Sequence, residues 1–175
     1  MTSDGKSEMD NGLSSPTPKG FATHDHAACV SDAMAVADEH CKKSGLRFTP
    51  VRRRVLEILL EKHRALGAYA ILEQLSEDGF GAQPPVAYRA LDFLVLHGLA
   101  HKIERLNAFT ACAHPGHDHA PAFMICRLCD AVAETASALS QGRLDEVAKA
   151  TGFRIERTLV EAEGVCPSCV SKGNA

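Results

Sequence analysis

Two Cys-x-x-C pairs, Cys126 with Cys129 and Cys166 with Cys169, carry the strongest chemical signal in this sequence. Four thiolates at this spacing suit the closed tetrahedral coordination that Zn²⁺ takes in structural sites. A redox-active dithiol is the alternative, but that chemistry needs one such motif rather than a matched pair. The two pairs therefore predict a structural zinc site, which would tie the end of the chain back to the start of a small C-terminal domain.

A second, looser group of metal-ligand side chains lies before and between these pairs. Its members are His101, Cys112, His114, His117, His119 and Glu134. Each of them alone is more commonly a solvated side chain or, for the cysteine, a small buried one. Taken together, nitrogen, sulfur and oxygen donors suit a tetrahedral Zn²⁺, and the thiolate weighs against a purely hard-cation site. This group predicts a second metal site at a hinge between two domains.

The overall composition indicates a folded protein whose chemistry depends on metals rather than on aromatic surfaces. The chain has 175 residues, 45% of them hydrophobic, which is enough for the core of one or two small domains. It contains 7 Cys and 9 His but no Trp. The first 20 residues lack the apolar segment of a secretory signal, and no run approaches the roughly 18 apolar residues of a membrane helix. We therefore expect a cytoplasmic protein with reduced thiols.

Local charge, rather than net charge, indicates a nucleic-acid partner. The formal net charge is -3, but between Lys42 and Arg64 eight basic residues stand against two acidic ones. A positive segment joined to an acidic remainder is typical of a DNA-binding face, because phosphate contacts supply much of the affinity. A charge run alone is more often a solvated helix face, so the interpretation depends on the surrounding fold. Arg52, within this segment, is a predicted DNA contact.

The hydrophobic pattern of the first two thirds predicts a winged helix-turn-helix. Helices are expected over Ser31 to Gly45, from Thr49-Pro50 onward, over Ala68 to Asp78 and over Val86 to His97. Two short runs, Leu99 to Glu104 and Ala108 to Ala113, then predict a two-stranded hairpin. In this arrangement Tyr88 and Arg89 lie near the start of the fourth helix, where they can reach a groove edge or a phosphate.

The last third predicts a small α/β domain, so that the whole chain belongs to the α+β class. Strands are expected over Phe123 to Cys126, Ala131 to Thr135 and Phe153 to Ala162, with a helix at about Ala136 to Thr151. The expected divisions are a flexible tail over 1–28, the winged-helix DNA-binding domain over 29–112, a His-rich hinge over 113–121 and a zinc-stapled domain over 122–175.

Over about Ser31 to Val170 the sequence resembles the ferric uptake regulator family and, within it, the zinc uptake regulators. The resemblance rests on Leu46 to Arg52, on Pro84 to Leu94, on His101-Lys102 and on the two Cys-x-x-C pairs. The Tyr-Arg-Ala-Leu-Asp-Phe-Leu run from Tyr88 and the two pairs are specific together. The chain departs from the family pattern at Pro85-Val86-Ala87, where Pro-Thr-Val is usual, and at Val51, where Gln is usual.

The resemblance implies a homodimeric, zinc-responsive transcriptional repressor that binds operator DNA and controls zinc uptake genes. It implies that the C-terminal domain is the dimerisation domain, that each subunit holds two Zn²⁺ ions, and that Tyr88 and Arg89 contact DNA. The matching structural ligands are Cys126, Cys129, Cys166 and Cys169. The matching regulatory ligands are His101, Cys112, His119 and Glu134, with His117 as an alternative or additional ligand.

Three other interpretations of the sequence can be compared with this one. An iron- or peroxide-responsive regulator of the same fold would differ chiefly in its hinge ligands, and Cys112 speaks against it because those sites favour His and carboxylates. A zinc-stapled protein-interaction module would share the structural site but not salt-dependent DNA binding. An enzyme is not expected, because the sequence holds no G-x-S-x-G, H-E-x-x-H or Gly-rich phosphate loop.

Overall fold

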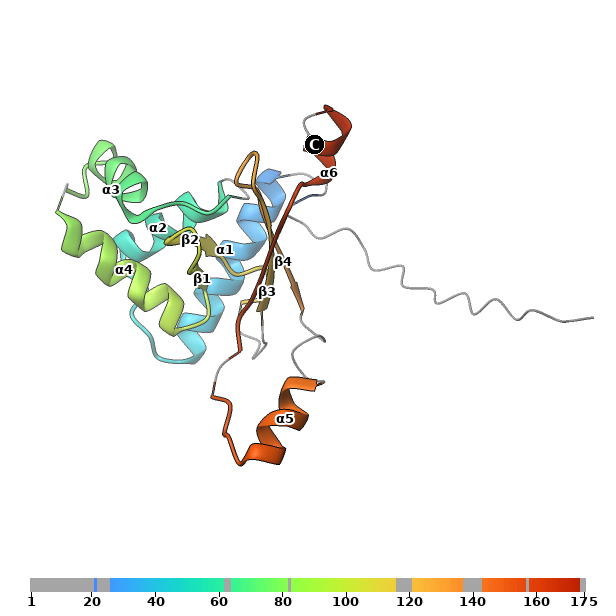
Figure 1. Ribbon diagram of the computed structural model, residues 1–175. Helices are drawn as coiled ribbons and strands as arrows, with labels where there is room; N and C mark the ends of the chain where they lie inside the picture. Colours follow the sequence, from blue (N-terminus) through green and yellow to red (C-terminus); the bar gives the residue numbers. More distant parts are fainter. Residues whose placement is uncertain are drawn as a thin grey trace, which may run out of the picture.

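The computed structural model describes residue 21 and residues 26–61, 64–81, 83–115, 121–136, 143–156 and 158–173. The helices are α1 (His26–Lys43), α2 (Pro50–Leu60), α3 (Ala68–Glu77), α4 (Pro84–Leu96), α5 (Arg143–Thr151) and α6 (Pro167–Ser171). The strands are β1 (Ala100–Ile103), β2 (Ala108–Ala111), β3 (Pro121–Cys126), β4 (Val132–Ala136) and β5 (Val160–Gly164). Figure 1 shows α1 to α4 gathered on one side of the β3–β5 sheet, with α5 and α6 beyond its opposite ends.

The first four helices surround one apolar core, which α2, α3 and α4 fill with side chains at helical spacing. The largest fully buried side chains on these helices are Val55, Ile58, Leu59, Ile71, Leu75, Leu91 and Leu94. Thr49 caps α2, since its hydroxyl accepts a hydrogen bond from the Arg52 amide, and Pro50 occupies the first turn, where no amide donor is needed. These local signals start α2 where the sequence predicts it.

The predicted hairpin forms as an antiparallel pair and makes the wing of a winged helix. β1 and β2 pair with His101 opposite Thr110, and Asn107 has a positive φ of 45° in the connecting turn. The segment after α2 extends this small sheet, because Leu66 and Phe109 exchange two backbone hydrogen bonds of 2.8 Å. The predicted helix-turn-helix with a wing is therefore confirmed.

The second sheet has the strand order β4-β3-β5, with β4 antiparallel and β5 parallel to the central β3. Its apolar face does not face solvent, because Ile103 of the wing packs against Phe123, Ile125 and Val132 in a shared cluster. Ile103 and Phe123 are both 0% exposed. The wing and the C-terminal sheet therefore form one packed unit, and the predicted α+β class is confirmed.

Several element boundaries differ from the predictions. α1 begins at His26, five residues before the predicted start, because Ala27 and Ala28 favour helix and Val30 packs against the N-terminal core. The predicted fourth helix begins at Pro84 rather than Val86, since prolines fit the first turn. Residues 1–20 and 22–25 of the predicted tail lie outside the described residues.

The boundaries in the C-terminal part also shift. Ala136 ends β4 rather than starting a helix, and α5 is described only from Arg143. Phe153 does not begin a strand: its amide donates to Ala148 while Gly152 has φ +72°, so the two residues close α5 in a left-handed cap. β5 therefore starts only at Val160. The structure also adds α6, within the second Cys-x-x-C pair. Among the described residues, no helix is both long and apolar enough to cross a membrane.

Candidate metal centres and nucleic-acid surface

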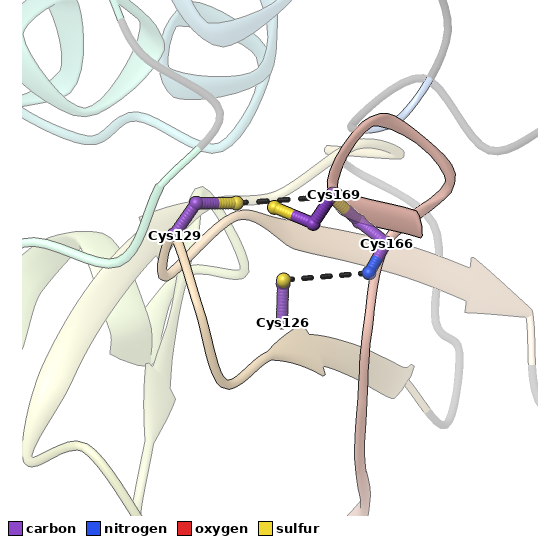
Figure 2. A group of neighbouring side chains, drawn as sticks. All are labelled: Cys126, Cys129, Cys166 and Cys169. Atoms are coloured by element: carbon purple, nitrogen blue, oxygen red, sulfur yellow. Dashed lines mark hydrogen bonds between the residues drawn. The ribbon is translucent and has the colours of Figure 1, made fainter. Parts of the chain in front are cut away.

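The structure brings the four cysteines of the two pairs together, as the sequence predicts (Figure 2). Cys126 ends β3, Cys129 follows in the adjoining turn, and Cys166 and Cys169 come from the start of α6. Their sulfur atoms all lie within 4.8 Å of one another, and Cys129 Sγ lies 3.7 Å from Cys166 Sγ. Cys126, Cys166 and Cys169 are buried. The spacing of the four sulfur atoms suits one tetrahedral cation with no open position for a substrate.

Backbone amides near this cluster stabilise negative charge on the sulfur of Cys126. Burial disfavours the Cys126 thiolate, but amide donors from Cys166, Leu128 and Cys129 outweigh it and lower the pKa of Cys126 to about 6. Hydrogen bonding to Cys166 and Cys129, together with burial, raises the pKa of Cys169 to about 12. The protein groups alone therefore favour one thiolate strongly, and a dication is needed to hold all four in the ionised form.

His101, Cys112 and Glu134 form a second cluster between the wing and the C-terminal sheet. One ligand atom of each lies within 4.8 Å of the others. His101 Nε2 is 3.5 Å and Cys112 Sγ is 4.0 Å from the same carboxylate oxygen, Glu134 Oε1. His101 comes from β1, Cys112 follows β2, and Glu134 belongs to β4. These ligands reach the cluster from both sides of the contact between the wing and the sheet.

The surroundings of this trio hold its side chains in place and keep water out. The Glu134 side chain is 4% exposed, and its Oε2 accepts a 2.8 Å hydrogen bond from the Ala113 amide. The His101 ring lies 5.4 Å from the Phe123 ring. Burial and the neighbouring Glu134 raise the pKa of Cys112 to about 12, against a smaller lowering by the His114 amide. A cation at the centre would stabilise the Cys112 thiolate against both burial and the charge of Glu134. The trio therefore fits a metal that binds thiolate and imidazole.

The fourth ligand of this cluster is the part of the prediction that the structure leaves open. His117 and His119 lie outside the described residues. His114 approaches the trio instead, with its Nδ1 3.9 Å from Glu134 Oε1 and its amide 3.3 Å from Cys112 Sγ. The sequence placed His114 in the wider group of candidates but gave no reason to select it. Its side chain is 55% exposed.

The predicted DNA contacts lie on or beside the fourth helix. Tyr88 and Arg89 are both exposed near the start of α4. Arg52 reaches α4 from α2: its guanidinium lies 3.6 Å from the centre of the Phe93 ring and donates to the Arg47 carbonyl. Tyr88 and Arg89 therefore face outward, whereas Arg52 is already held by contacts within the domain.

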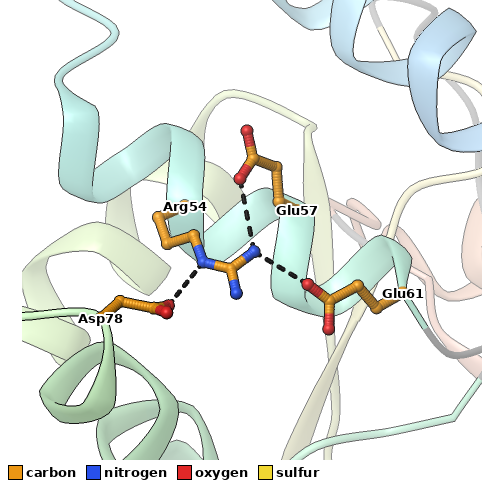
Figure 3. A network of polar contacts seen from close by, with 4 residues as sticks. All are labelled: Arg54, Glu57, Glu61 and Asp78. Atoms are coloured by element: carbon orange, nitrogen blue, oxygen red, sulfur yellow. Dashed lines mark hydrogen bonds and ion pairs between the residues drawn. The ribbon is translucent and has the colours of Figure 1, made fainter.

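The basic segment is less positive than its composition indicates. Arg54 contacts three carboxylates, at 2.6 Å from Asp78, 2.8 Å from Glu61 and 3.4 Å from Glu57 (Figure 3). Arg53 makes a two-point ion pair with Asp38 of α1. These arginines fix how α1, α2 and α3 pack, so the simple count of basic residues overstates the charge available to phosphate.

Comparison with known proteins agrees with this arrangement. The sequence pattern of the Ferric uptake regulator family matches residues 43–163. The zinc uptake regulation protein of Escherichia coli strain K12 is 34% identical over 142 residues, which cover 81% of this chain and 83% of the relative.

Solved structures give the same result. A zinc uptake regulator complexed with zinc and DNA matches with a TM-score of 0.79 and 33% identity, over 83% of this chain and 98% of that chain. The crystal structure of holo XcZur matches with a TM-score of 0.73 and 36% identity, over 81% of this chain and 99% of that chain. The chain therefore belongs to the ferric uptake regulator family, and among its members it is similar to the zinc uptake regulators.

Proposed function

We propose that this protein is a zinc-responsive transcriptional repressor, which binds operator DNA as a homodimer when its regulatory site holds zinc and so controls zinc uptake genes. The observation that carries the proposal is the trio His101, Cys112 and Glu134, which joins the wing to the C-terminal sheet. The similarity to a zinc uptake regulator complexed with zinc and DNA supports it. The proposal places the protein in the cytoplasm and gives it no catalytic role.

Two zinc sites with different roles follow from the two clusters. We assign the structural role to the four-cysteine cluster, because it is closed and joins α6 to the end of β3. We assign the regulatory role to His101, Cys112 and Glu134, completed by His119, by His117 or by both. When bound there, Zn²⁺ supplies the positive charge that offsets Glu134 and a Cys112 thiolate.

The regulatory trio can control DNA binding because its ligands belong to different parts of the fold. His101 and Cys112 move with the wing, and Glu134 moves with the C-terminal sheet. A ligand that prefers the docked arrangement shifts the population toward it, and a preference of about 100-fold corresponds to about 2.7 kcal/mol. In a dimer, docking fixes the distance between the two α4 helices, so that both can enter successive major grooves.

The C-terminal part offers an apolar surface for the second subunit. Leu144 and Val147 on α5, and Phe153 after it, are 52%, 58% and 69% exposed. They line a groove together with Ile155 and Leu159. Apolar side chains gathered in this way are typical of an interface, and a two-fold axis would let α5 of each copy cover the groove of the other.

The DNA contacts proposed are Tyr88 and Arg89 at the start of α4, with Arg52 as a further contact or as a support for α4. The proposed division is a tail over 1–28, a DNA-binding domain over 29–112, a hinge over 113–121 and a dimerisation domain over 122–175, although α1 begins within that tail at His26 and β3 begins at Pro121, the last hinge residue.

A mobility-shift titration on genomic DNA fragments tests the proposal. The protein keeps its structural zinc and is treated with a mild chelator, and zinc, iron or manganese is then added separately. Specific binding with zinc only is expected. Cys112→Ser should weaken this response, whereas Cys29→Ser on α1, outside both clusters, should leave it unchanged. Binding with iron instead would reassign the sensor, and no specific binding with any metal would leave the protein-interaction module.

A further inference from the structure

We propose that Glu161 is a positioning residue for the regulatory site: it holds the turn of the wing on the C-terminal sheet without metal and thereby sets the zinc concentration at which the site fills. This inference rests on the proposed function, because it concerns the regulation of the same site. It starts from a carboxylate on β5 that belongs to neither metal cluster.

Glu161 binds two consecutive backbone amides at the tip of the wing. Its Oε1 accepts a 2.8 Å hydrogen bond from the Glu104 amide, and its Oε2 accepts a 3.2 Å hydrogen bond from the Arg105 amide. The β1–β2 ladder ends at the pair Ile103 and Ala108, so these two amides lie in the turn, beyond the ladder. A carboxylate that accepts two amide hydrogen bonds makes a charge-assisted contact of defined geometry.

The position of Glu161 in the sheet relates it directly to the regulatory trio. Phe123 on the central β3 is paired with Glu134 on one side and with Glu161 on the other. Paired residues of neighbouring strands share a face of the sheet, so both carboxylates lie on the face that carries Phe123. One carboxylate contacts His101, and the other contacts the turn that follows Ile103.

The spacing of these groups along the wing matches their spacing across the sheet. Two strand separations place Glu134 and Glu161 about 10 Å apart. The three steps from His101 to Glu104 span about 10 Å of extended chain. β1 therefore lies across this row, with His101 at the metal trio, Ile103 against Phe123 and the turn at Glu161. The contact at Glu161, beside an ion pair between Arg105 and Glu163 of the same strand, fixes the other end of the strand that presents His101.

A contact of this kind acts on zinc affinity through the docked population. The apparent dissociation constant of a ligand equals its intrinsic value divided by the fraction of protein in the binding-competent conformation. Because Glu161 stabilises docking in the absence of zinc, its loss makes the docked wing rarer and leaves the ligands themselves in place. We expect Glu161→Ala to raise the zinc concentration for half-occupancy by up to about tenfold, which corresponds to about 1.4 kcal/mol of docking free energy. Saturating zinc should still restore operator binding.

The experiment combines a zinc titration with amide hydrogen exchange on the full-length protein. Zinc binding at the regulatory site is followed by competition with a chromophoric chelator, while the structural zinc content is checked separately. Exchange of the Glu104 and Arg105 amides is measured by NMR without regulatory zinc. Glu161→Ala should weaken zinc binding by up to about tenfold and lower the protection of both amides. Glu161→Gln keeps one acceptor oxygen and should fall between Glu161→Ala and wild type in both measurements.

Glu156→Gln is the matched control, because it makes the same chemical change in an exposed ion pair with Arg154 ahead of β5. It should match wild type in both measurements. Unprotected amides in the wild type, or wild-type zinc affinity in both Glu161 variants, would overturn the inference. Both measurements are separate from the proposed function, since they need no DNA. A protein that gives the expected zinc affinities and amide protection without binding any operator would refute the repressor and leave the role of Glu161 intact.

Discussion

Truncation of Ile103 offers a direct test of whether docking of the wing is coupled to zinc binding. Ile103 is 0% exposed, and its buried partners in the cluster, Phe123, Ile125 and Val132, all belong to the C-terminal sheet. An undocked wing would expose Ile103 to water. The loss of its methyl and methylene groups should therefore act mainly on the docking equilibrium rather than on the core of the N-terminal helices.

The expected size follows from the groups removed. Ile103→Val deletes one buried carbon and should weaken docking by about 1 kcal/mol, whereas Ile103→Ala should weaken it by about 3 kcal/mol. If zinc binds only the docked form, these changes lower the zinc affinity of the regulatory site by up to about fivefold and up to about 100-fold. The two variants thus form a graded series in which packing and zinc affinity change together.

The assay is the same chelator competition, performed beside urea unfolding of each variant. Ile71→Ala is the matched control, because Ile71 is also 0% exposed but lies on α3 in the N-terminal core. It should lower the free energy of unfolding by about 3 kcal/mol and leave zinc affinity close to wild type. Equal zinc affinity in Ile103→Ala and wild type would refute the coupling, since docking would then play no part in binding.

Four further predictions follow from the described contacts. Arg89→Ala should weaken operator binding and reduce the salt slope of log K by about one. Arg54→Met should leave that slope unchanged, because three carboxylates already neutralise Arg54, and the loss of these ion pairs should lower the free energy of unfolding by about 1 to 2 kcal/mol. Gel shifts at several salt concentrations measure the slope, and urea unfolding measures the stability. Val147→Asp should convert dimer to monomer in sedimentation velocity without unfolding the subunit, because Val147 is 58% exposed. Zinc affinity at the regulatory site should fall about tenfold per unit decrease of pH, because the pKa of Cys112 is raised to about 12 and its thiol must release a proton to bind metal. Zinc titrations at pH 7 and pH 8 measure this change, and Cys112→Ser should show a shallower pH dependence. Cys126→Ser, or removal of zinc by a strong chelator, should unfold the C-terminal part, as measured by zinc content and circular dichroism.

The metal clusters could be predicted from the sequence because their ligand types are chemically distinctive. Two matched pairs of cysteines at close spacing favour metal binding, and the structure brings all four together. His101, Cys112 and Glu134 were also predictable, because a hairpin and the next strand limit where their side chains can lie. The pairing of strands in a predicted hairpin thus indicates which side chains lie close together, whereas residue types alone do not.

The partners of the charged residues could not be predicted in the same way. The sequence shows that Arg53 and Arg54 are basic, but their carboxylate partners include Asp38 from α1 and Asp78 after α3. Only the packing of the helices brings these groups together. Glu161 gave no signal either, because its alternation with Glu163 along β5 is typical of a solvated strand edge.

The balance of contacts across the hinge explains why such a fold can sense a metal. The buried cluster between wing and sheet consists of Ile103, Phe123, Ile125 and Val132, and it is far smaller than the core of the N-terminal helices. A large apolar interface would keep the wing docked whether or not the trio held a metal, and the regulatory site would then have nothing to control. We infer that this small cluster, with the two amide hydrogen bonds to Glu161 and the ion pair between Arg105 and Glu163, leaves docking close enough to balance for a few kcal/mol at His101, Cys112 and Glu134 to decide it. The sensitivity of the protein is therefore set by the weakness of this interface as much as by its metal ligands.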